Sequence, residues 1–184
     1  GKTSEVDRLI LANALDAAQA WAGQGMRSST VCVNVAPATL LEPGFAQWLG
    51  AKLQRRGLPW GMLQLELTEH AIIACGAHMV QAINDLRTLG VGVFMDDFGA
   101  GYSSLGVLAD LPISGIKCDR LFVRQLPQDP RRQSLLRHVV RLARDLQLEV
   151  VVEGVETEQE LQSVLESGIG NVQGYFFSKA MPPE

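Results

Sequence analysis

Short apolar runs alternate along the chain with longer segments in which apolar residues recur at helical spacing. The short runs predict six strands, at residues 31–35, 63–67, 91–95, 116–118, 150–152 and 171–173. The longer segments predict amphipathic helices near residues 5–22, 44–56, 76–89, 130–146 and 157–167. Strands and helices that alternate at this spacing indicate a parallel sheet joined by crossover helices.

Two of the predicted helices carry further signals. The helix at 130–146 has arginines opposite an apolar stripe formed by Leu135, Val139, Leu142 and Leu146. In the helix at 157–167, Thr157 followed by Glu160 predicts a capping box at the start, and Gly168 predicts a C-cap at the end.

The predicted fold class is α/β, and two parallel architectures remain open. One is an open doubly wound sheet, and the other is a closed (β/α)8 TIM-type barrel. A barrel needs eight units and typically about 250 residues. This chain has 184 residues, so as a barrel it is incomplete, with about six β/α units and two strands missing.

The composition indicates one folded domain rather than a nucleic-acid or membrane protein. Apolar residues make up 47% and charged residues 20% of the chain, and the net charge of −4 argues against DNA binding through overall charge. The three cysteines, Cys32, Cys75 and Cys118, lack metal-site spacing and indicate reduced thiols. The sequence has no membrane-spanning apolar run and no signal-peptide pattern, so we expect a cytoplasmic domain.

Polar residues recur at the ends of the predicted strands. Because ligands of parallel α/β folds bind at the carboxyl ends of the strands, six successive strands would deliver polar groups to one site. These residues are Asn34, Glu66, Asp96, Asp97, Lys117, Glu153 and Gln173.

Together with Glu156, this set holds five carboxylates and one lysine, a formal charge of −4. Like charges about 4 Å apart repel by about 4 kcal/mol at an effective dielectric of about 20, so protonation or bound cations must relieve the repulsion. Oxygen ligands without His or Cys suit Mg²⁺ or Mn²⁺ better than Zn²⁺. The adjacent Asp96 and Asp97 could serve two ions, the arrangement used for displacement at phosphorus.

Five motifs resemble the EAL-domain family, namely L-E-L-T-E (65–69), D-D-F-G-A-G-Y-S-S-L (96–105), I-K-C-D (116–119), V-E-G-V-E (152–156) and V-Q-G-Y (172–175). Members of this family are bacterial phosphodiesterases that linearise cyclic di-GMP on a β/α barrel. The resemblance runs from Asp7 to Pro182 and implies a single EAL-like domain over residues 1–184.

The resemblance implies two metal ions, Mg²⁺ or Mn²⁺, held by five of the candidate residues. Asn34, Glu66 and Asp96 would ligate one ion. Asp97 would join Asp96 around the second ion, which Glu156 would support.

The resemblance also implies roles in catalysis and in coupling. Glu153 would act as general base, Lys117 would position the attacking water or a phosphate oxygen, and Gln173 would bind water or ligand. Glu69 would hold a glycine-rich loop that couples the site to a homodimer interface, and the loop residues concerned are Gly99, Gly101, Tyr102 and Ser103.

One departure from the family concerns the N-terminal part. The tripeptide E-A-L, whose Glu is a metal ligand in the family, is absent from this sequence. The helix at 5–22 matches the helix before the family's third strand, so the resemblance implies an N-terminally truncated domain without its first two strands. The parent protein is expected to carry regulatory or GGDEF-type domains and to be cytoplasmic, or the cytoplasmic part of a larger membrane-anchored protein.

Three functions remain open at this point. The first is metal-dependent hydrolysis of cyclic di-GMP to the linear dinucleotide pGpG, because every family ligand within the covered span is present. The second is a catalytically inactive cyclic di-GMP receptor or protein-interaction module, because the first glutamate is absent. The third, an unrelated metal-dependent enzyme on a β/α barrel, is disfavoured by the specific segment 96–105.

Overall fold

The computed structural model describes residues 2–26, 30–101 and 105–181. The chain divides into two compact units. The first unit comprises residues 1–94 and 111–113, and the second comprises residues 95–110 and 114–184. Among the helices described, none is both long and apolar enough to cross a lipid bilayer.

Each of the six predicted apolar runs forms a strand. The strands are β1 (Val31–Asn34), β2 (Leu63–Thr68), β3 (Gly92–Phe98), β4 (Gly115–Cys118), β5 (Glu149–Val152) and β6 (Asn171–Val172). They are hydrogen-bonded in chain order in one sheet, and the pairs β1–β2, β4–β5 and β5–β6 are parallel. This arrangement confirms the predicted parallel α/β class.

Helices follow the strands, and the short ones escaped prediction because they hold too few residues for a periodic pattern. The α-helices are α1 (Lys2–Gly23), α2 (Pro37–Leu40), α3 (Phe45–Arg56), α4 (Glu69–Thr88), α5 (Leu105–Asp110), α6 (Pro130–Asp145) and α7 (Glu158–Glu166). The 3₁₀ turns are η1 (Trp60–Met62), η2 (Arg120–Phe122) and η3 (Leu126–Gln128).

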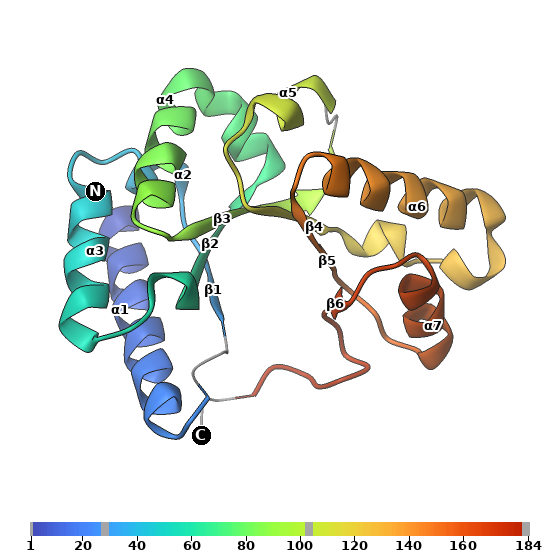
Figure 1. The fold of residues 1–184 in the computed structure, drawn as a ribbon, viewed down its shortest axis with the longest axis horizontal. Coiled ribbons are helices and arrows are strands. Elements are labelled where there is room, and N and C mark those ends of the chain that lie inside the picture. Colours follow the sequence, from blue (N-terminus) through green and yellow to red (C-terminus); the bar gives the residue numbers. More distant parts are fainter. Residues whose placement is uncertain (1, 27–29, 102–104, 182–184) are drawn as a thin grey trace. The chain divides into compact units, whose positions relative to one another are not determined.

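In the first unit, α1 and α3 lie side by side and pack next to the sheet (Figure 1). Leu11 and Leu15 of α1 are completely buried, as are Leu49 and Leu53 of α3. Burial of a leucine side chain contributes about 1.5–3 kcal/mol, so this helix pair supplies much of the core of the unit.

A buried carboxylate joins α1 to the turn that follows β1. Asp7 accepts hydrogen bonds from the backbone N–H of Ala36, at 3.0 Å, and from the hydroxyl of Thr39, at 2.5 Å. The contact fixes the chain directly after Asn34, the candidate site residue at the end of β1.

Helix α4 begins earlier than the sequence predicted. It starts at Glu69 and is interrupted at Gly76, which has φ 53° and ψ −137°. Only glycine adopts such a conformation readily, and a glycine inside a helical pattern reads as a helix boundary. The sequence therefore indicated the part after Gly76 and missed the part before it.

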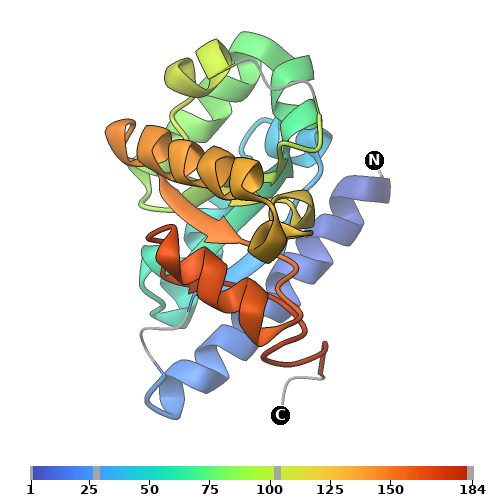
Figure 2. The same ribbon diagram turned by 90° about the vertical axis from the view of Figure 1, so that its right-hand side faces the viewer.

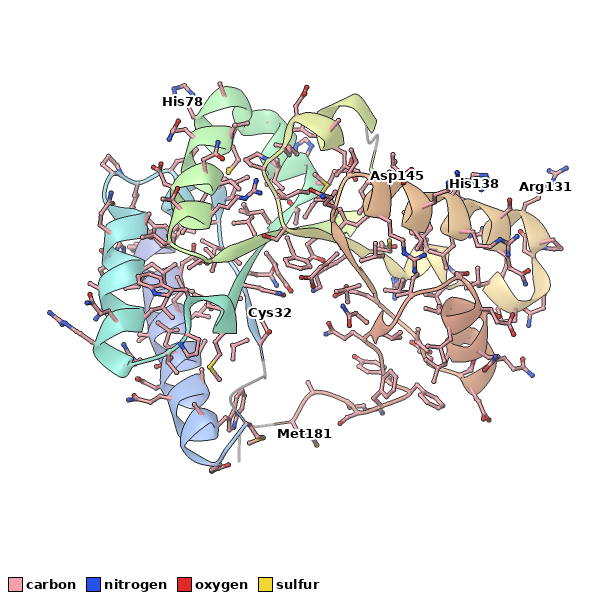
Figure 3. The ribbon with its side chains drawn as sticks, in the orientation of Figure 1. Cys32, His78, Arg131, His138, Asp145 and Met181 are labelled. Atoms are coloured by element: carbon pink, nitrogen blue, oxygen red, sulfur yellow. The ribbon has the colours of Figure 1, made fainter. Side chains whose placement is uncertain are left out.

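In the second unit, the apolar stripe predicted for α6 is displaced by one residue. The buried residues are Leu136, Val140 and Ala143, whereas Leu135 of the predicted stripe is 55% exposed. Helix α6 packs next to β5 (Figure 2), and the labelled Arg131 and His138 project away from the sheet (Figure 3). The small Ala143 carries a weak hydrophobic signal, which is why the sequence favoured the neighbouring stripe.

The predicted start and end of α7 are confirmed. The Thr157 hydroxyl accepts a hydrogen bond from the Glu160 N–H, and the Glu160 carboxylate accepts from the N–H groups of Glu156 and Thr157. Gly168 follows the helix with φ 86°, the left-handed conformation expected after a helix C-terminus.

We expect Thr157→Ala to lower the free energy of unfolding by about 1 kcal/mol, because the N–H of Glu160 loses its acceptor. Thr157→Ser keeps a hydroxyl at the same position and serves as the matched control. Urea denaturation followed by circular dichroism measures the difference. An alanine variant as stable as the serine variant would contradict the expected effect of the cap.

Candidate functional site

In the second unit, a buried lysine joins two carboxylates at the ends of neighbouring strands. Lys117 on β4 is 6% exposed, and its Nζ lies 2.5 Å from Oε1 of Glu153 and 3.7 Å from Oδ1 of Asp96. Asp96 lies in β3, and Glu153 directly follows β5. A buried ammonium group is costly unless it is paired, and here the two carboxylates provide that pairing.

Asp97 occupies an electrostatically unfavourable position next to this group. Its φ of 55° lies in the left-handed region, which aspartate and asparagine adopt more readily than most residues other than glycine. Desolvation raises the pKa of Asp97, and repulsion from Asp96 and Asp119 raises it further, although Lys117 acts in the opposite direction. A nearby cation would relieve the same repulsion.

The two residues that follow Lys117, Cys118 and Asp119, are part of the surroundings of this group and were not among the candidate residues. Asp119 accepts a hydrogen bond from the N–H of Leu121 at 2.8 Å and adds to the negative potential at Asp97. Its place in the I-K-C-D motif, two residues after Lys117, is the signal that could have identified it. Cys118 is fully buried, and burial together with the nearby Glu153 raises its thiol pKa to about 12, so it is a protonated thiol and a poor nucleophile.

The segment after β5 is tied to the segment after β6 by backbone hydrogen bonds. The N–H of Gln173 donates to the carbonyl of Val152 at 2.8 Å, and the N–H of Val155 donates to the carbonyl of Gln173 at 3.2 Å. Gln173 itself is exposed. The backbone at Glu153 and the backbone at Gln173 are therefore held next to each other.

A polar cavity of about 330 Å³ lies beside the segment after β5. Two arginines, two glutamates and one glycine line it. These residues are Arg120, Arg124, Gly154, Glu156 and Glu160. The cavity is part of the second unit and adjoins Glu156, one of the candidate metal ligands.

In the first unit, two further candidates meet across neighbouring strands. Asn34 on β1 and Glu66 on β2 are partners in the parallel register, and the Asn34 side-chain amide donates to Oε2 of Glu66 at 3.3 Å. Glu66 is 3% exposed. The pair places an amide group and a carboxylate next to each other toward the carboxyl ends of β1 and β2. Their role as metal ligands stays a prediction.

Glu69 and the described glycines of the loop that it was predicted to hold belong to different units. Glu69 is 4% exposed and opens α4 in the first unit. Gly99, with φ 89°, and Gly101 belong to the second unit. Tyr102 and Ser103 lie outside the described residues, so the predicted coupling of this loop to a homodimer stays a prediction.

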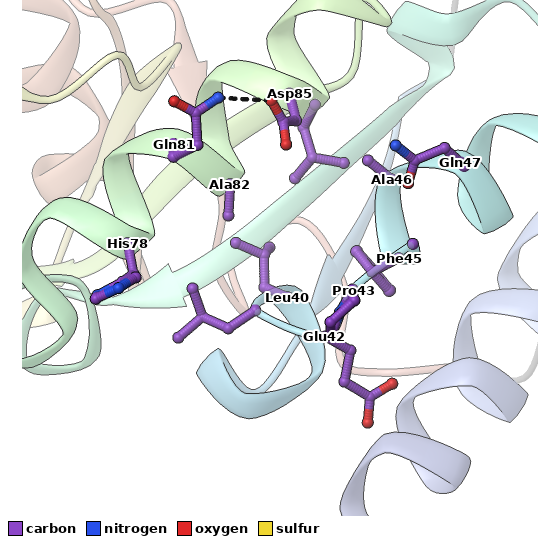
Figure 4. Close-up of a pocket in the computed structure, with 13 residues that line it drawn as sticks. Leu40, Glu42, Pro43, Phe45, Ala46, Gln47, His78, Gln81, Ala82 and Asp85 are labelled. Atoms are coloured by element: carbon purple, nitrogen blue, oxygen red, sulfur yellow. Dashed lines mark hydrogen bonds between the residues drawn. The ribbon is translucent and has the colours of Figure 1, made fainter.

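The first unit also contains a cavity of about 230 Å³ away from these candidates (Figure 4). It lies between α4 and the segment that joins α2 to α3, and its lining includes His78, Gln81 and Asp85. Asn34, Glu66 and Glu69 do not line it. The side chains of His78 and His138 are both exposed.

The donors in the second unit fit a hard divalent cation in their chemistry. They are carboxylate oxygens, the ligands that Mg²⁺ and Mn²⁺ prefer, and at Asp97 the charges are poorly compensated. Within the described part of the chain, however, no three His, Cys, Asp or Glu side chains gather in a group that could hold a metal ion. Lys117 is instead the cation that contacts Asp96 and Glu153.

Comparison with known proteins places this geometry in context. The family model described as EAL domain matches residues 1–180. The cyclic di-GMP phosphodiesterase RocR of Pseudomonas aeruginosa is 39% identical over 151 residues, which is 82% of this chain and 38% of RocR. A curated mycobacterial protein is 34% identical, with the match covering 98% of this chain and 29% of that protein. The chain thus spans well under half the length of these relatives.

This chain is also similar to solved structures of EAL-domain proteins. The crystal structure of the EAL domain of Mycobacterium smegmatis DcpA is similar with a TM-score of 0.90 and 33% identity, covering 97% of this chain and 80% of that one. A calcium and cyclic di-GMP complex of Klebsiella pneumoniae BlrP1 has a TM-score of 0.88 and 32% identity, covering 96% of this chain and 44% of BlrP1. Of the two predicted architectures, these neighbours confirm the TIM-type barrel class.

Proposed function

Because the chain belongs to the EAL-domain family, we propose that it hydrolyses cyclic di-GMP to the linear dinucleotide pGpG in a metal-dependent reaction. The observation that carries the proposal is the ion-paired group Asp96, Lys117 and Glu153 at the ends of three strands. The group consists of two carboxylates and one ammonium group. All three residues belong to motifs by which the chain resembles the family.

The reaction is the hydrolysis of one of the two phosphodiester groups of cyclic di-GMP. The water oxygen forms a bond to phosphorus, the bond from phosphorus to a 3′ oxygen breaks, and the product retains a 5′ phosphate. One water proton goes to a base, and the leaving oxygen takes up a proton. Glu153 is the proposed base, because its carboxylate directly follows β5, is held by Lys117 and is of a type that can accept a proton from water.

Lys117 is proposed to orient the reacting groups. Its ammonium is buried and bonded at 2.5 Å to Oε1 of Glu153, so it fixes the direction of that carboxylate. It also places a positive charge where the phosphate develops additional negative charge. Asp96 restrains the same lysine from the other side, at 3.7 Å.

Divalent ions would be held in the second unit by Asp96, Asp97 and Glu156. The roles of Asn34 and Glu66 of the first unit as oxygen ligands stay predictions. When bound, such ions acidify water and neutralise phosphate charge. The repulsion that raises the pKa of Asp97 supports this proposal, and so does the complex of the relative BlrP1 with calcium and cyclic di-GMP. We propose Mg²⁺ or Mn²⁺ and two ions.

The test supplies cyclic di-GMP with Mg²⁺, with Mn²⁺ or with EDTA, and follows the products by liquid chromatography. Formation of pGpG with either ion and its loss in EDTA are the expected results. Binding of cyclic di-GMP, measured by calorimetry, without any product at either ion would overturn the proposal and favour the receptor. The predicted homodimer, partner domains and cytoplasmic location stay predictions.

A further inference from the structure

We propose that the turn η2 is a positioning element that holds the two acidic segments of the second unit in register with each other. Its first residue, Arg120, contacts the segment 153–156, and its last residue, Phe122, contacts the segment 96–99. The effect on catalysis rests on the proposed phosphodiesterase function. The mechanical role can be tested without it.

Phe122 is packed against the end of β3. Its ring stacks on that of Phe98, with centroids 6.3 Å apart and an interplanar angle of 6°. The ring also lies so close to Gly99 that a Cβ at this glycine would collide with it. Gly99 has φ 89°. The two contacts fix the backbone that directly follows Asp96 and Asp97.

Arg120 is packed against the segment after β5 in the same manner. Gly154 has φ 76°, and a Cβ at this position would collide with Cβ of Arg120. Gly154 lies between Glu153, the proposed base, and Glu156, a proposed metal ligand. A contact at Gly154 therefore restrains both carboxylates through the backbone.

Backbone hydrogen bonds join Cys118 and Asp119, the two residues that precede the turn, to the same two segments. The N–H of Asp119 donates to the carbonyl of Phe98 at 3.3 Å, and the N–H of Glu153 donates to the carbonyl of Cys118 at 3.0 Å. Asp119 also caps the turn by accepting from the N–H of Leu121. The turn thus has short contacts with both segments, and the two segments carry the carboxylates that Lys117 joins.

This geometry assigns Phe122 a role that is distinct from core burial. The ion pairs of Lys117, at 2.5 Å and 3.7 Å, depend on the separation of the two acidic segments. A displacement of about 1 Å at reacting groups lowers rates by up to about 100-fold. Loss of the Phe122 ring should therefore change the chemical step more than substrate binding.

The first test compares Phe122→Ala with Leu121→Ala, a matched control because Leu121 lies in the same turn and its side chain is exposed. We expect Phe122→Ala to lower kcat by about 10- to 100-fold with KM changed less than about threefold. Leu121→Ala should leave both unchanged. Equal effects of the two variants, or a loss confined to KM, would overturn the proposal.

The second test uses the contact of Phe122 with Gly99. Gly99→Ala should lower kcat because its Cβ collides with the ring. Adding Phe122→Ala should then cost less than the product of the two separate losses, by at least about fivefold, because the collision is gone. Adding Leu121→Ala to Gly99→Ala should leave the loss in kcat of the single Gly99→Ala variant unchanged. Multiplicative losses with Phe122→Ala would mean that the positive φ of Gly99, not the ring, is what alanine disturbs.

Hydrogen exchange separates failure of this inference from failure of the proposed function. In Phe122→Ala, peptides that contain residues 96–101 and 153–156 should both exchange faster, while the peptide of α6 should not change. Leu121→Ala should match the parent at all three. This pattern would support the positioning role even in a protein that does not hydrolyse cyclic di-GMP. Faster exchange at residues 96–101 alone would overturn it.

Discussion

Replacing Glu153 by glutamine is expected to lower kcat for cyclic di-GMP hydrolysis by about 1,000-fold, within the range that a general base contributes. Glutamine has nearly the same shape but cannot take up the water proton. Its amide oxygen can still accept a hydrogen bond from Lys117, which lies 2.5 Å from Oε1 of Glu153. The loss therefore reports on proton transfer more than on geometry. Steady-state kinetics with saturating Mn²⁺ measures it.

The same change should affect stability far less than activity. Lys117 is buried, and removal of one partner of a buried ion pair typically costs 3–5 kcal/mol. Asp96 remains within 3.7 Å of Nζ, and the Glu153 side chain is 26% exposed, so a smaller cost of about 1–2 kcal/mol is expected. Thermal unfolding checks that the variant is folded at the assay temperature.

Glu158→Gln is the matched control for this experiment. Glu158 is exposed on α7, and its change removes one negative charge from the same unit. It should keep the parent kcat. If Glu153→Gln also kept the parent kcat, Glu153 could not be the base. If Glu158→Gln lowered kcat as much as Glu153→Gln does, the effect would be due to the change in net charge.

The strands and the candidate residues on them were predictable because buried parallel strands are short, apolar and β-branched, as at 150–152. A polar residue within or after such a run, such as Lys117 or Glu153, stands out against that background. Local pattern was enough for these features. The pairing of Asn34 with Glu66, in contrast, depends on the register of β1 against β2 and was not predicted from the sequence.

Other features depended on tertiary contacts that local pattern does not contain. That Lys117 forms ion pairs with both Asp96 and Glu153 was not predictable, because these contacts depend on how three strands are placed. The left-handed backbone at Asp97 is equally invisible, since aspartate favours turns and helix caps as well. On α6, Leu135 and Leu136 are chemically identical, and only the position of β5 decides which one is buried.

Asp97→Asn should have opposite effects on ligand binding and on stability. Loss of this carboxylate is expected to weaken Mn²⁺ binding by at least about 10-fold and to lower activity at limiting metal. Asparagine tolerates the left-handed conformation of this position, where φ is 55°, so the backbone should be retained. Isothermal titration calorimetry with Mn²⁺ measures the change in affinity.

In metal-free protein the same variant should be more stable at neutral pH. Desolvation and the charges of Asp96 and Asp119 raise the pKa of Asp97 above its ordinary value of 3.8. The folded state therefore binds more protons than the unfolded state between the two pKa values, and the free energy of unfolding decreases as pH rises through that window. The penalty is complete at pH 7, and asparagine removes it.

Because Asp97 is an exposed residue, screening reduces the gain, and we expect a rise in Tm of about 1–2 °C in EDTA at pH 7. The rise should disappear below the unfolded pKa of Asp97, where the parent carboxyl is protonated in both states. Glu149→Gln, which removes an exposed charge at the start of β5, should show no such pH dependence. A lower Tm for Asp97→Asn at pH 7, together with unchanged Mn²⁺ affinity, would mean that this carboxylate stabilises the fold and does not serve as a metal ligand.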